Sequence, residues 1–127
     1  MKTIIQTESA PAPIGPYNQA TMIHGVLYTS GQIAIDPKTN ALVTTDIQTE
    51  TRLVLENLKA VVEAAGLGLK DVVKCSIFIS DMGQFADINA IYAEYFEEAT
   101  APARETVQVA CLPKNVNIEI SAIAVRP

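Results

Sequence analysis

The chain has 127 residues, of which 49% are hydrophobic and 18% are charged, and its net charge is −5. This length and composition predict one folded domain over residues 1–127 and exclude a disordered tail. The nine lysine and arginine residues are scattered along the chain, which excludes a basic stripe that could neutralise the successive phosphates of a nucleic acid.

Two further features limit the class of protein. The first dozen residues hold only one short apolar pair, and no stretch is long and apolar enough to span a bilayer, so we expect a cytoplasmic protein. His24 is the only histidine, and Cys75 and Cys111 have no cysteine or histidine neighbours at ligand spacing, so we expect no zinc site within one subunit. Both cysteines are predicted to be small buried side chains rather than a disulfide or a nucleophile.

The first predicted elements are two short β segments within residues 19–30. His24 and Gly25 separate them, and a glycine suits a tight turn there because it tolerates positive φ. His24 is therefore interpreted as a turn residue rather than a catalytic one. A dense cluster of turn-forming residues at 36–40 closes this β region.

A helix is predicted to follow over residues 47–65, since apolar side chains recur at the i, i+7, i+8, i+11, i+14 spacing of one helical stripe. Thr45 or Asp46 can cap its first turn, and Gly66 stands where a left-handed residue often ends a helix. The stripe consists of Ile47, Val54, Leu55, Leu58, Val61, Val62 and Ala65.

A strand and a second helix are predicted next. Residues 72–80 are rich in β-branched side chains and end at turn-forming residues 81–83. Helical spacing of apolar residues then resumes from Phe85 to about Glu98, and we interpret this aromatic stripe as part of the core.

Two strands end the chain. Side chains alternate over residues 104–110, the pattern breaks at 112–115, and residues 118–125 form the final predicted strand. The element order is therefore β, β, α, β, α, β, β, which predicts a mixed sheet with both crossover helices on one face. The last strand also carries Ile123 and Val125 on its other side, and we expect a second copy of the chain to cover that face.

Arg104 and Glu119 are the polar residues that stand out in these last two strands. If the strands form a hairpin through Pro113, the two side chains lie near its opposite ends and are not directly paired. Their spacing fits a functional pair and a surface ion pair, worth roughly 0 to 1 kcal/mol, equally well.

Two loops offer further candidate residues. In residues 12–17 two prolines and a glycine constrain the backbone, which suits a rigid loop that presents Tyr17, although a packing role fits equally. Ser30 and Gly31 end a strand, and the backbone of such a glycine can approach a ligand closely.

These segments together resemble the RidA/YjgF family. The resemblance covers nearly the whole chain, and its spaced arginine and glutamate motif is specific. It is carried by residues 14–17 (IGPY), 29–33 (TSGQI), 102–104 (PAR), 112–113 (LP) and 118–120 (IEI).

The resemblance implies an α+β, chorismate-mutase-like fold, a mixed sheet with two helices on one face, assembled as a homotrimer with pockets between subunits. It implies a hydrolytic deaminase that converts 2-aminoacrylate, 2-iminopropanoate and 2-iminobutanoate to 2-keto acids and ammonia, with no cofactor and no metal. The expected partners are then small 2-imino and 2-keto acids and other copies of the chain, with neither nucleic acid nor membrane. A non-catalytic module that binds small carboxylates on the same fold is the alternative.

The family motif also implies roles for individual residues. Arg104 resembles the arginine that holds the substrate carboxylate, and Glu119 resembles the acid that positions or deprotonates the attacking water. Tyr17 is implied to close the pocket, and Ser30 and Gly31 are implied to contact the substrate through a hydroxyl and the backbone.

The resemblance places Asn89 near the site as well, and the chain departs from the family pattern beside the arginine. Glu105 stands where a small residue is usual, and Thr106, which we expect to line the substrate site, stands where a cysteine is often found. A required cysteine nucleophile is thereby excluded, which favours direct attack of water on the imine carbon. Strand alternation is expected to point Glu105 away from the side of Arg104.

Overall fold

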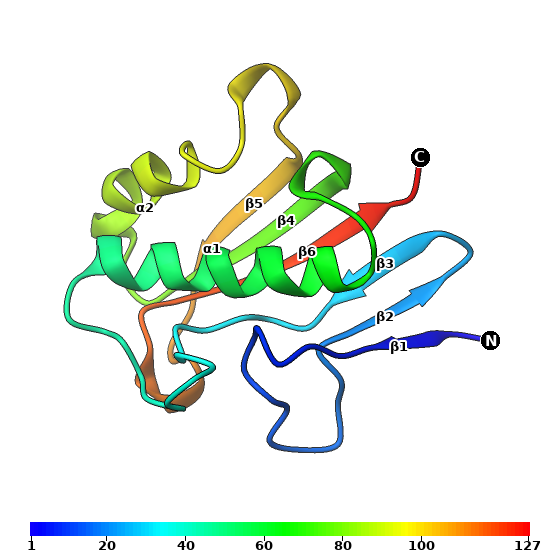
Figure 1. Ribbon diagram of the computed structural model, residues 1–127. Helices are drawn as coiled ribbons and strands as arrows, with labels where there is room; N and C mark the ends of the chain where they lie inside the picture. Colours follow the sequence, from blue (N-terminus) through cyan, green and yellow to red (C-terminus); the bar gives the residue numbers. More distant parts are fainter.

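Six strands form one mixed sheet and two helices cover one of its faces in the computed structural model, which describes residues 1–127 (Figure 1). The strands are β1 (Thr3–Ile5), β2 (Ala20–Ile23), β3 (Val26–Thr29), β4 (Val72–Ile79), β5 (Ala103–Gln108) and β6 (Ile118–Val125), and the helices are α1 (Ile47–Ala64) and α2 (Phe85–Tyr92). The sheet order is β1-β2-β3-β6-β4-β5, and only β4 and β5 run parallel. The predicted α+β fold with both helices on one face is confirmed.

Helix α1 forms where the apolar stripe predicted it. Asp46 caps its start by accepting a hydrogen bond from the backbone N–H of Thr49 at 2.7 Å, and Gly66 follows its end with a φ of +80°. Val54, Leu58 and Val61 of this stripe are fully buried. Burial of this stripe against the sheet stabilises the helix, since propensity alone contributes little.

The first three strands form a meander at one end of the sheet. Positive φ values at His24 (50°) and Gly25 (77°) make the predicted tight turn between β2 and β3. Strand β1 was not predicted, and it pairs with β2 from Thr3 opposite Met22 to Ile5 opposite Ala20. Three residues are too few for an alternating pattern, so only the tertiary pairing reveals this strand.

The last two strands do not form the hairpin through Pro113 that the sequence allowed, because β4 lies between β5 and β6. The crossover through α2 brings β5 beside β4 in the parallel direction, and β6 then pairs with the other edge of β4 and with β3. The segment around Pro113 therefore passes across the end of β4 instead of forming a tight turn.

The second helix is shorter than predicted, since α2 ends at Tyr92 rather than near Glu98. Turns follow the helix, as in the hydrogen bond from the N–H of Tyr95 to the carbonyl of Tyr92 at 3.0 Å. Spacings of three and four residues suit both geometries, so Tyr92 and Phe96 still reach the core, with ring centroids 4.7 Å apart.

One of the two cysteines differs from the prediction. Cys75 is buried in β4, whereas Cys111 is exposed and its Sγ donates to Oδ1 of Asn115 at 3.1 Å. Strand β5 ends at Gln108, two residues earlier than the alternating pattern predicted. Cys111 therefore lies in the loop that follows the strand and not in the sheet.

The sheet face opposite the helices is partly apolar and uncovered within the protomer, as predicted from β6. Phe78 and Ile123 are half-buried there, and Val107 and Val125 are exposed at 40% and 38%. A second copy of the chain that packed on this face would bury these side chains.

Candidate active site

Arg104 lies near the start of β5, on the side of the sheet that carries the helices. It stands opposite the fully buried Cys75 of β4, and paired residues of a ladder share a face. Its Nη1 donates to Oδ1 of Asn89 at 2.8 Å, and its Cζ lies 4.8 Å from the ring centroid of Tyr92 and 5.6 Å from that of Phe85. Arg104 forms no salt bridge, so its positive charge is available to an anionic ligand.

Helix α2 supplies all three of these contacts. Phe85, Asn89 and Tyr92 are spaced i, i+4, i+7, which puts them on one face of the helix. Asn89, predicted to be near the site, therefore contacts Arg104 directly. Phe85 and Tyr92 were assigned only to the core from the sequence, although their shared face with Asn89 was a signal for a second role.

Arg104 also lines a shallow hollow with Met82, Phe85 and Thr106. The Oγ1 atom of Thr106 is buried there without a hydrogen-bond partner. Glu105 points to the opposite face, as expected, and accepts hydrogen bonds from Ser76 and Lys74, which lower the pKa of its carboxyl. The carboxylate of Glu105 therefore does not compete with a bound anion for the guanidinium of Arg104.

Glu119 lies on the other face of the sheet, opposite Phe78 of β4. Its carboxylate is half-buried, has no hydrogen-bond partner, and has its pKa raised above the ordinary value by burial. A carboxylate with these properties is available to exchange a proton with a bound water or substrate.

Gly31 allows this placement of Glu119. A Cβ atom at residue 31 would lie 2.6 Å from Cδ and 2.8 Å from Cγ of Glu119, and would also overlap Oε2. Only a residue without a side chain leaves room for the carboxylate in this position.

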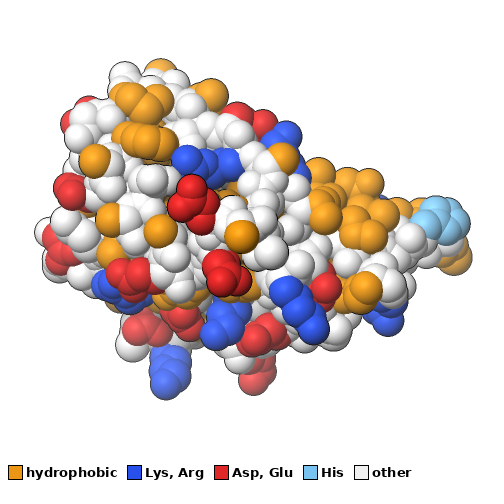
Figure 2. Space-filling model, turned by 90° about the horizontal axis from the view of Figure 1, so that it is seen from above, with side chains coloured by type: hydrophobic (Ala, Val, Ile, Leu, Met, Phe, Trp, Pro, Cys, Tyr) orange, Lys and Arg blue, Asp and Glu red, His pale blue; other side chains and the backbone are white.

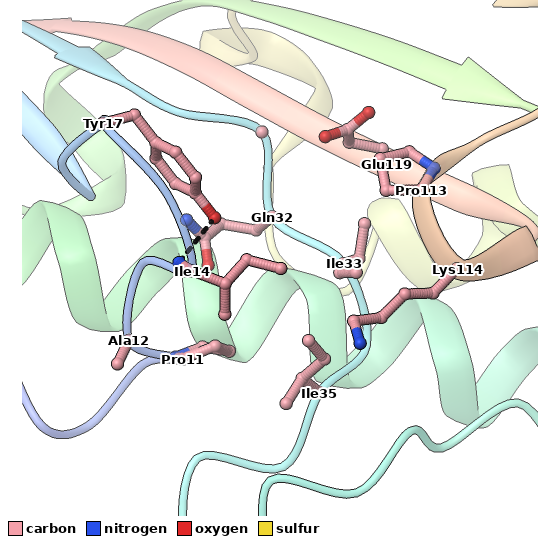
Figure 3. A pocket seen from close by; sticks show the side chains of 11 residues that line it. Pro11, Ala12, Ile14, Tyr17, Gln32, Ile33, Ile35, Pro113, Lys114 and Glu119 are labelled. Atoms are coloured by element: carbon pink, nitrogen blue, oxygen red, sulfur yellow. Dashed lines mark hydrogen bonds between the residues drawn. The ribbon is translucent and has the colours of Figure 1, made fainter.

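Glu119 and Gly31 line a cavity of about 90 Å³ between the N-terminal loop and the segment around Pro113 (Figure 3). Tyr17 stands on one side of it, and its hydroxyl accepts a hydrogen bond from the N–H of Ile14 at 3.4 Å. Lys114, which sequence reasoning did not single out, lines the other side with a left-handed backbone (φ 56°). The cavity is lined by Pro11, Ala12, Ile14, Tyr17, Gly31, Gln32, Ile33, Ile35, Pro113, Lys114 and Glu119.

The loop that carries Tyr17 is held by the buried side chain of Gln19. Its Oε1 accepts from the N–H of Thr7 at 2.7 Å, and its Nε2 donates to the carbonyls of Thr7, Ala10 and Pro11 at 2.8 to 3.2 Å. Ser30 also ties this region together, because its Oγ donates to the carbonyl of Asn18 at 2.6 Å, and it does not line the cavity.

The candidate residues thus form two groups. Arg104, Asn89 and Thr106 lie on the helix side of the sheet, while Glu119, Gly31 and Tyr17 line a separate cavity that none of the first three lines. Strand β4 separates β5 from β6, so one protomer does not bring the arginine and the glutamate together.

Comparison with known proteins identifies the family. The model of the family described as Endoribonuclease L-PSP matches residues 7–126. The chain is 53% identical to the 2-iminobutanoate/2-iminopropanoate deaminase of Salmonella typhimurium, with 99% of each chain covered. The chain belongs to the RidA/YjgF family.

Solved structures of RidA/YjgF proteins share the whole fold. The YjgF gene product of E. coli superposes with a TM-score of 0.93 at 49% identity, over 98% of this chain and 99% of that one. E. coli TdcF with bound serine gives a TM-score of 0.93 at 48% identity, with the same coverage.

Two further findings concern metal ions and membranes. No group of three or more histidine, cysteine, aspartate or glutamate side chains is placed to hold a metal ion. None of the helices combines the length and the apolar character that crossing a membrane requires.

Proposed function

We propose that this protein hydrolyses small 2-imino acids and their enamine tautomers to 2-keto acids and ammonia. The observation that carries the proposal is the guanidinium of Arg104, which has no ionic partner and only one hydrogen bond, at Nη1. A planar guanidinium edge matches a carboxylate with two parallel hydrogen bonds. The name of the Salmonella relative and the serine bound to TdcF support a small substrate that carries an α-carboxylate.

The proposed site is shared between subunits of a homotrimer. Arg104 and Glu119 face opposite sides of one sheet, and a substrate of four carbons cannot contact both within a protomer. The partly apolar open face, with Phe78 and Ile123, supports an assembly in which a second copy packs there. The arginine of one subunit then meets the glutamate of its neighbour.

The chemistry needs one water and no redox step. Arg104 binds the carboxylate, and Glu119 takes a proton from a water whose oxygen attacks the imine carbon. Attack on the protonated imine gives a neutral carbinolamine, and Glu119 returns the proton to its nitrogen. The hydroxyl group then gives its proton to Glu119 as the C–N bond breaks, so that ammonia leaves and the 2-keto acid is the product. Tyr17 lies at the cavity that holds Glu119, where its ring can limit access of bulk water.

The charge of the chain does not favour the ribonuclease activity that the description of the family model suggests. The net charge of −5 opposes binding to a polyanion. On the face drawn in Figure 2, lysine and arginine side chains are interspersed with aspartate and glutamate rather than gathered into a groove.

The direct test couples the purified protein to a threonine dehydratase and follows release of 2-ketobutyrate and ammonia. Acceleration over the spontaneous rate, lost in Arg104→Ala, is expected. Unchanged rates together with calorimetric binding of 2-ketobutyrate would replace the proposal with a carboxylate-binding module. Unchanged rates without binding would contradict both.

A further inference from the structure

Two aromatic side chains of α2, those of Phe85 and Tyr92, contact the guanidinium of Arg104. We propose that Phe85 and Tyr92 are positioning residues: together with Asn89 they form an aromatic cradle that fixes the Arg104 guanidinium so that its Nε–Nη2 edge receives the substrate carboxylate. This inference rests on the proposed function, because it assigns the carboxylate of an imino acid as the ligand of that edge.

The first step of the argument is the contact geometry. The Cζ atom of Arg104 lies within 6 Å of both ring centroids, at 4.8 Å for Tyr92 and 5.6 Å for Phe85, which is the range of cation–π attraction. An exposed arginine otherwise samples many rotamers. Two rings and the hydrogen bond to Asn89 restrict the guanidinium plane.

The second step is the rigidity of the support. Tyr92 is buried at 5% exposure and packs on the buried Phe96. Ile88 and Ile91 anchor the same helix in the core, which holds the backbone that carries both rings. Tyr92 therefore ties one side of this support to the core.

The third step is which edge remains free. Asn89 accepts from Nη1, so a carboxylate at the Nη1–Nη2 edge would have to share Nη1 with Asn89. Nε and Nη2 have no partner, and these two donors form the side-on fork that binds both oxygens of one carboxylate. The cradle thus selects the direction from which a carboxylate approaches.

Phe85 offers the cleaner variant because it is half-buried, whereas truncation of Tyr92 would leave a cavity in the core. In Phe85→Leu we expect the Kd for 2-ketobutyrate and the KM for the imine to rise about fivefold, with kcat nearly unchanged. Phe85→Tyr is expected to restore both constants, since it restores the ring. Tyr95→Leu serves as the matched control, because it removes a half-buried ring that contacts Arg52 and Glu56 rather than Arg104.

A measurement on Arg104 itself separates this inference from the proposed function. The order parameter of the Arg104 Nε–Hε bond, measured by NMR relaxation in the ligand-free protein, is expected to fall in Phe85→Leu and to stay unchanged in Tyr95→Leu. An Nε–Hε bond equally ordered in Phe85→Leu and in the parent would overturn the cradle even if the enzyme is active. If the parent protein neither hydrolyses imines nor binds 2-ketobutyrate, the proposed function fails, and the assignment of the free edge to a substrate carboxylate fails with it.

Discussion

Arg104 and Glu119 point to opposite faces of one sheet, because β4 pairs with both of their strands and places Arg104 opposite Cys75 and Glu119 opposite Phe78. Neighbouring residues of β4 alternate in direction, and positions 75 and 78 are three apart, so their partners face opposite ways. An isolated protomer is therefore not expected to be active, and this expectation can be tested.

Mixed oligomers test whether the site is shared. Arg104→Ala and Glu119→Gln chains, each inactive alone, are unfolded together and refolded as a mixture. In a cyclic trimer with sites between subunits, roughly a quarter of the sites regain both side chains, and activity should recover to that extent. Inactivity of the mixed oligomers would place both residues' functions within one subunit.

Arg104→Lys should weaken substrate recognition while it keeps the positive charge. An ammonium cannot offer a two-donor planar edge, so kcat/KM should fall about ten- to hundredfold. Steady-state kinetics with the coupled dehydratase assay measure the loss. Arg52→Lys, which alters an exposed arginine paired with Glu94, is the control and should behave as the parent.

The pH profile should depend on Glu119. Burial raises the pKa of its carboxyl, and the base form is required, so activity should fall with decreasing pH through a midpoint above that of an ordinary glutamate. In Glu119→Gln we expect kcat/KM to drop by roughly 10² to 10⁴ and this acid limb to vanish. An acid limb that persists in the variant would assign it to another group.

The same shift affects stability. Between the unfolded-state pKa and the raised folded-state pKa, the folded protein binds more protons, so the free energy of unfolding decreases as pH rises through that window. Glu119→Gln should therefore be more stable than the parent in urea at pH 7, and the difference should disappear below the ordinary carboxyl pKa. Glu63→Gln, which removes an exposed carboxylate by the same substitution, is the matched control.

Gly31→Ala should impair catalysis without unfolding the protein. The added Cβ overlaps the Glu119 side chain and displaces its carboxylate, while the backbone of residue 31 does not require a glycine. We expect kcat to fall by about tenfold or more and the midpoint of thermal unfolding to change little. A crystal structure of the variant with Glu119 unmoved and full activity would show that the contact is unimportant.

Gln19→Leu should loosen the loop that carries Tyr17. The substitution leaves the N–H of Thr7 and three carbonyls without their partner, which should cost about 1–3 kcal/mol in urea unfolding. Limited proteolysis should cut residues 7–12 faster than in the parent. The exposed Gln48→Leu is the control and should change neither measurement.

Local patterns account for what was predictable. Helix α1 carries its own periodicity, its cap at Asp46 and its terminal Gly66, and β4 and β6 carry β-branched or alternating residues, so these elements are visible without tertiary information. The family motif pointed to Arg104 and Glu119 as candidates. Strand β1 is too short to show a pattern, and the aromatic residues of α2 satisfy the core pattern whether or not they also contact an arginine.

The sequence by itself determined the types of the longer elements and their amphipathic faces, because these depend on neighbours a few positions away, and its resemblance to a family supplied the candidate residues. Only the tertiary structure decided that β4 separates β5 from β6, that Gly31 makes room for Glu119, and that α2 supports Arg104. These relationships join residues far apart in the chain, and the choice among possible strand neighbours depends on how the whole sheet pairs and packs.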